Sequence, residues 1–105
     1  MRVEYGEAAT DDIVRQFRYY SIETGVPEMA DRFESAITQT MKSLGGRPYL
    51  GRRFSPEIPQ YRELRSWQVA GFEIIRIYYE VDTDVIRIIR VLHGMRNVRR
   101  ILENE

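Results

Sequence analysis

The sequence predicts an α+β domain in which two helices pack on one face of an antiparallel sheet. Apolar residues follow helical spacing in residues 7–46 and alternate as in strands through most of residues 61–92. Helices that are contiguous in sequence, followed by strands joined through short turns, are typical of this class. At 105 residues the chain fits one domain, residues 1–105, because a single core usually takes about 100 to 150 residues.

The first half predicts a short strand followed by a helical hairpin. Residues 2–5 alternate polar and apolar side chains. Gly25 and Pro27 separate two helical patterns, since glycine favours the end of one helix and proline the first turn of the next. Gly45 and Gly46 end the second helix. The inward faces consist of Ala9, Ile13, Phe17 and Tyr20 in the first helix and Ala30, Phe33, Ile37, Met41 and Leu44 in the second.

The second half predicts an irregular connector and three strands. Residues 47–60 hold three of the four prolines, which indicates irregular structure. The strands are expected at residues 61–64, with up to two more residues, at 72–81 and at 85–92. Asp82, Thr83 and Asp84 make a tight turn, so the last two strands form an antiparallel hairpin. A short terminal helix can follow from Asn97.

The sheet face away from the helices is expected to meet a partner. Apolar side chains assigned to it make it too apolar for solvent, and a partner segment laid across it would cover them. Arg87 and Arg90 are three residues apart, so a regular strand would place them on opposite faces, whereas a bulge would bring them together. The apolar residues assigned to this face are Tyr78, Ile86, Ile88 and Leu92.

Composition excludes several classes of function. The chain has no cysteine and one histidine, so we expect neither thiol chemistry nor a conventional metal site. No apolar run is long enough for a membrane helix, and the first residues lack the apolar core of a secretion signal, so we expect a cytoplasmic protein without cofactors. The net charge is zero, yet residues 87–100 carry five arginines and no acid. Arginine offers a rigid fork for phosphate or carboxylate groups.

Several segments together resemble the RelE/ParE superfamily of toxins from type II toxin–antitoxin systems. They are the helical hairpin, the connector PYLGRRF, the strand YRELR, the hairpin IIRIYYEVDTDVIRIIRVLHGMRN and the arginine-rich tail. The resemblance covers nearly the whole chain. It implies a small bacterial protein held inactive by a cognate antitoxin, whose extended segment wraps the toxin and often adds to its sheet. Because the antitoxin usually supplies the DNA-binding domain, no sequence-specific DNA contact by this chain is implied.

The target that the resemblance implies depends on the branch. RelE-like members cleave mRNA on the ribosome, with connector lysines and a tyrosine near the C-terminus that this sequence lacks; its nearest catalytic candidates would be His93, Arg65 and Arg96. ParE-like members poison DNA gyrase without a catalytic set. The absence of the RelE-like residues and the ending VLHGMRN favour the ParE branch. A third alternative is a harmless antitoxin-binding co-repressor.

Two groups of arginines are candidates for binding, one for the target and one for the antitoxin. Arg96, Arg99 and Arg100 have no acid close in sequence before Glu103, so they are candidates for binding the target. Arg52 and Arg53 lie on the connector, where contact residues concentrate, and are assigned with them. Arg87 and Arg90 face solvent as ordinary strand residues, pair with Glu73, Glu80 or Asp82 across the hairpin, or bind the antitoxin. The predicted antitoxin-binding set is Arg87, Arg90, Tyr78, Ile88 and Leu92.

Overall fold

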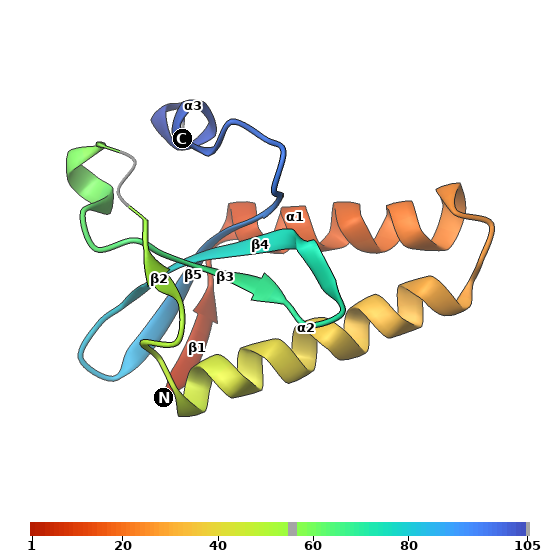
Figure 1. Cartoon of the computed structure of the whole chain (residues 1–105), viewed down its shortest axis with the longest axis horizontal. Coiled ribbons are helices and arrows are strands. Elements are labelled where there is room, and N and C mark those ends of the chain that lie inside the picture. Colours follow the sequence, from red (N-terminus) through yellow and green to blue (C-terminus); the bar gives the residue numbers. More distant parts are fainter. Residues whose placement is uncertain (55–56, 105) are drawn as a thin grey trace.

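The computed structural model describes residues 1–54 and 57–104 and has one five-stranded mixed sheet with two long helices on one face (Figure 1). The strand order is β1-β5-β4-β3-β2. The predicted α+β class and the short C-terminal helix are confirmed. The strands are β1 (Arg2–Tyr5), β2 (Arg52–Arg53), β3 (Arg65–Val69), β4 (Phe72–Val81) and β5 (Val85–His93); the helices are α1 (Glu7–Arg18), η1 (Tyr19–Glu23), α2 (Glu28–Gly46), η2 (Pro59–Tyr61) and α3 (Val98–Glu103).

The helical hairpin forms where the spacing of apolar residues predicts it. α1 continues into the π-helical turn η1, and Gly25 then adopts a positive φ of 69°, which costs glycine little. Pro27 caps α2, and α2 ends at Gly46. The inward faces of both helices pack on one sheet face in the main core, around Phe33, Leu44, Ile77 and Tyr79. Among the described residues, no helix combines the length and apolarity needed to cross a membrane.

Strand β1 is the one strand that departs from the antiparallel expectation. The strands β3, β4 and β5 pair antiparallel as predicted, but β1 pairs in parallel with β5, with Arg2 opposite Val85 and Tyr5 opposite Ile88. β1 is joined to the sheet through the helical hairpin, so no tight turn forces it to run antiparallel. The backbone N–H of Gly6 donates to the carbonyl of Ile88 at 2.9 Å and extends this pairing by one residue.

The strand predicted at residues 61–64 is wrong. Pro59 starts the 3₁₀ turn η2, because its fixed φ suits a helical turn. Leu64 follows the turn and is fully buried, and the strand begins only at Arg65. Conversely, the connector contains β2, which pairs with β3, so it is not wholly irregular. The predicted connector also includes residues 55 and 56, which lie outside the described residues.

Gly51 shows why the connector motif needs a glycine. A Cβ added there would lie 2.7 Å from the hydroxyl oxygen of Tyr79 and 2.8 Å from the carbonyl oxygen of Ser66. The Gly51 N–H donates to the same Tyr79 hydroxyl at 2.9 Å, which in turn donates to the carbonyl of Pro48 at 2.8 Å. The glycine therefore permits a close approach that fixes the connector on β4.

We expect Gly51→Ala to lower the free energy of unfolding by about 2 to 3 kcal/mol, because the added methyl group must displace backbone or a buried tyrosine. Urea unfolding of the purified protein measures this. The control is Gly46→Ala, since a Cβ at Gly46 would meet no atom within 4 Å. Equal stability of the two variants would contradict the role given to Gly51.

Candidate functional site

The sheet face away from the helical hairpin is covered by the chain itself. The connector and α3 fold over this face and form a second apolar cluster on it (Figure 1). Val98 and Leu102 hold α3 down, and the Asn97 side chain caps the helix by accepting from the N–H of Arg100 at 3.1 Å. The expectation that a partner must cover this face is therefore wrong. The cluster consists of Ile58, Leu64, Tyr78, Leu92, Val98 and Leu102.

Three residues predicted to bind an antitoxin are buried. Tyr78 and Leu92 are 4% and 2% exposed beneath the connector and α3, and burial raises the pKa of the Tyr78 phenol. Ile88 is fully buried on the opposite face, under the helices, because it pairs with Tyr79. Ile86 lies on that helix-covered face too, opposite Val81. The predicted contact through Tyr78, Ile88 and Leu92 is therefore corrected, since a partner cannot reach these side chains in this conformation.

A bulge in β5 explains the changed faces. Tyr78 pairs with Arg90 and Tyr79 with Ile88, which leaves Ile89 as the extra residue. Arg87 lies opposite Glu80, two residues from Tyr78 on β4, so the bulge places Arg87 and Arg90 at same-face positions of the ladder. This is the bulged alternative that the three-residue spacing left open.

Arg90 is committed to a buried ion pair that sequence reasoning missed. Asp12 of α1 is 1% exposed and accepts from Arg90 Nε at 2.7 Å and from Nη2 at 2.8 Å. Asp12 also accepts from the backbone N–H of Val91 at 2.9 Å. The sequence predicts that Arg90 faces solvent, pairs across the hairpin or binds an antitoxin. These predictions are corrected, because the guanidinium group binds Asp12 of α1. Asp12 lies three residues after the buried Ala9, on the inward face of α1, and this spacing was the available signal.

Arg87, in contrast, lies at the surface and pairs as one alternative predicted. Its Nη1 donates to Asp82 Oδ2 at 2.7 Å, and both side chains are about half exposed. The Thr83 N–H and then Arg87 lower the pKa of the Asp82 carboxyl. An exposed pair of this kind contributes little stability, so Arg87 stays available to a partner.

The α3 region presents two arginines without carboxylate partners. Arg99 donates to Glu103 at 3.0 Å and to Glu57 at 3.3 Å, which ties it to the connector. Arg96 and Arg100 are exposed, and neither forms an ion pair within the part of the chain that is described. They line an open hollow of about 290 Å³ together with Asn97, Ile101 and Asn104.

The two connector arginines lie at the sheet edge formed by β2. Arg53 pairs with Glu63 at 3.0 Å in an exposed contact, whereas Arg52 has no ion pair with any residue of 1–54 or 57–104. Phe54, which follows Arg53, packs against the same apolar cluster as α3. The predicted target-binding arginines thus lie on the connector, on α3 and in the bend just before α3.

Two of the residues expected of a nuclease, Arg65 and His93, are kept apart, whereas Arg96 lies in the same turn as His93 and its backbone N–H donates to the His93 carbonyl at 3.0 Å. Arg65 lies opposite Tyr79 and His93 opposite Ile75, on the two different neighbours of β4 and four positions apart along it, which is about 13 Å of strand. Arg65 is held by the carbonyl of Gly51 at 2.8 Å and stacks over Tyr49. His93 Nδ1 accepts from the N–H of Met95 at 3.3 Å and so shapes the turn after β5. No acid–base pair is assembled from His93, Arg65 and Arg96.

Metal chemistry has no candidate among the described residues, since no three His, Asp or Glu side chains gather there. The chemistry that the arrangement offers is recognition of acidic groups by Arg52, Arg96 and Arg100.

Comparisons with known proteins bear on this arrangement. Residues 3–98 match the family model described as the ParE toxin of type II toxin–antitoxin system, parDE. The fold is similar to a solved chain described as the chromosomal ParDE TA system from P. aeruginosa, with a TM-score of 0.70 and 20% sequence identity. That similarity covers 89% of this chain and 95% of the solved chain. No curated protein sequence matches this chain significantly.

Proposed function

The chain belongs to the ParE toxin family of type II toxin–antitoxin systems, and we propose that it arrests growth by poisoning DNA gyrase until a cognate antitoxin neutralises it. The observation that carries this proposal is the family match, which runs from residue 3 to residue 98 of 105. A toxin–antitoxin family implies a cognate antitoxin as partner. Gyrase acts on DNA in the cytoplasm, so we expect the toxin to act there too.

The geometry favours binding over catalysis. Cleavage of mRNA would need a positioned acid and base near the reacting phosphate, and His93 and Arg65 are separated, and each already forms a hydrogen bond with a backbone group. Arginine itself is too basic to exchange protons at neutral pH. Unpaired arginines on α3 and in the bend before it suit a target that carries carboxylates or phosphates, as gyrase bound to DNA does.

The decisive experiment adds the purified toxin, released from its antitoxin, to DNA gyrase with plasmid DNA and ATP. We expect loss of supercoiling and accumulation of linear plasmid after denaturation of the enzyme, because a poison traps the cleaved-DNA state. The control is the same toxin preincubated with its antitoxin, which should restore supercoiling.

Folded, growth-arresting toxin that leaves gyrase unaffected would contradict the proposal. Cleavage of mRNA on ribosomes would then identify the nuclease alternative. Expression without antitoxin that does not slow growth would instead identify a non-toxic co-repressor.

A further inference from the structure

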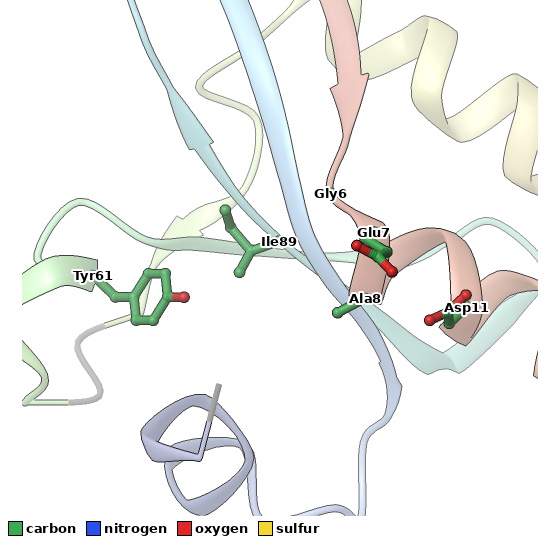
Figure 2. Close-up of a pocket in the computed structure, with 6 residues that line it drawn as sticks. All are labelled: Gly6, Glu7, Ala8, Asp11, Tyr61 and Ile89. Atoms are coloured by element: carbon green, nitrogen blue, oxygen red, sulfur yellow. The ribbon is translucent and has the colours of Figure 1, made fainter.

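An open hollow lies where α1 begins, and none of the arginines assigned to the target lines it. It measures about 530 Å³ and is open to solvent. Figure 2 shows Ile89 and Tyr61 on one side and the first turns of α1 on the other, with α3 below. Its lining consists of Gly6, Glu7, Ala8, Asp11, Tyr61 and Ile89.

The apolar part of this hollow comes from the bulge in β5. Ile89 is the extra residue of the bulge, and bulges commonly re-aim a side chain. Ile89 is only partly buried against the second apolar cluster. With Ala8 and the ring of Tyr61 it gives the hollow an apolar wall that a partner side chain could cover (Figure 2).

The acidic part of the hollow brings two like charges close together on α1. Glu7 and Asp11 are four residues apart on one helix, so their like charges repel by about 0.2 to 0.5 kcal/mol. Neither forms an ion pair within residues 1–54 and 57–104. Arg15, which follows Asp11 by one helical turn, contacts Asp12 instead at 3.3 Å. A cation placed between the two carboxylates would remove this repulsion.

We propose that this hollow receives a segment of the cognate antitoxin that places a Lys or Arg side chain between Glu7 and Asp11 and an apolar side chain against Ile89. The inference rests on the proposed function, which supplies the antitoxin as partner. The charge of the hollow argues against gyrase as its occupant. A gyrase–DNA complex presents phosphates, which the carboxylates of Glu7 and Asp11 would repel. The acidic hollow and the basic α3 surface therefore serve different partners.

The test compares antitoxin binding by wild-type toxin and by the double variant Glu7→Gln, Asp11→Asn. The probe is the full-length antitoxin encoded beside the toxin gene, titrated by calorimetry at two salt concentrations. We expect about tenfold weaker binding, with a smaller loss of affinity in high salt than wild type shows. The thermal midpoint of the free variant should stay close to that of wild type, because the loss of the i, i+4 repulsion and the loss of the favourable interaction of Glu7 with the helix dipole offset each other.

Two further variants test the position of the charge and the apolar side of the hollow separately. The matched control Asp31→Asn, Glu34→Gln makes the same charge change in a hollow on α2 lined by polar residues alone, and it should bind the antitoxin like wild type. Ala8→Phe fills the apolar side of the hollow and should weaken binding at least fivefold without unfolding the protein.

Unchanged affinity in both the charge variant and Ala8→Phe would overturn the inference, as would an equal loss in the α2 control. Gyrase trapping by each free variant is measured in parallel. Loss of trapping in the Glu7, Asp11 variant would assign the hollow to the target and overturn the proposed occupant. Absence of trapping by the wild-type toxin would refute the proposed gyrase target alone.

Discussion

Replacing Asp12 by Ala should destabilise the protein by about 3 to 5 kcal/mol, the usual cost of leaving one charge of a buried ion pair without its partner. Arg90 is 14% exposed and donates twice to Asp12, so its guanidinium would stay largely desolvated while losing both hydrogen bonds to the carboxylate. The N–H of Val91 would lose its acceptor as well. Because small domains have about 5 to 15 kcal/mol in total, we expect a clear fall in the urea midpoint and in the yield of folded protein.

The control for Asp12 is Arg15→Ala. Arg15 also contacts Asp12, but its side chain is 64% exposed, so its removal should change stability by less than about 0.5 kcal/mol. The double variant Asp12→Leu, Arg90→Met should recover most of the loss, because it leaves no buried charge behind. A loss below about 1 kcal/mol in Asp12→Ala would contradict the account of this pair as the link between α1 and β5.

This pair also shows where sequence reasoning ends. The helices and the β4–β5 hairpin follow from local spacing and from the turn at Asp82, Thr83 and Asp84, so they could be predicted. Asp12 and Arg90 are 78 residues apart, and only the packing of α1 beside β5 brings them together. An acid near the start of a helix is normally explained by its favourable interaction with the helix dipole. That explanation gave no reason to place Asp12 on the inward face of α1.

The misassigned antitoxin residues have a different cause. A strict alternation from Val85 places Ile86, Ile88 and Leu92 on one face, but the bulge at Ile89 shifts the alternation by one residue. Ile88 therefore lies under the helices and Leu92 under α3. Nothing local in a run of β-branched residues marks which of them is the extra one, so the face of each residue depended on pairing with β4.

The candidate target surface was predictable in part. The exposure of Arg100 follows from its place in a short helix whose other face holds Val98 and Leu102, and Arg96 lies exposed in the bend before that helix. The engagement of Arg99 by Glu57 could not be foreseen, because it depends on the connector folding against α3. This difference within one cluster makes an internally controlled experiment possible.

Replacing Arg96 and Arg100 together by Ala should relieve growth arrest and raise the toxin concentration needed to trap gyrase at least tenfold. Both guanidinium groups are exposed, and neither has a carboxylate partner among the described residues, so their charge is available to phosphates or carboxylates of the target. A tenfold change corresponds to about 1.4 kcal/mol, a modest loss for two charged contacts. The fold should survive, because Asn97, Val98 and Leu102 continue to anchor α3.

Two controls separate this result from a general effect of charge or of unfolding. Arg99→Ala removes one positive charge from α3, beside Arg100, but only breaks exposed pairs with Glu57 and Glu103, so it should retain most of the toxicity. Arg18→Ala, Arg32→Ala removes two charges from the helical hairpin and should leave gyrase trapping unchanged. Full toxicity in the Arg96, Arg100 variant, with a normal urea midpoint, would show that α3 does not contact the target. Equal loss in the hairpin control would show that net charge alone determines toxicity, because both double variants lower it by the same two units.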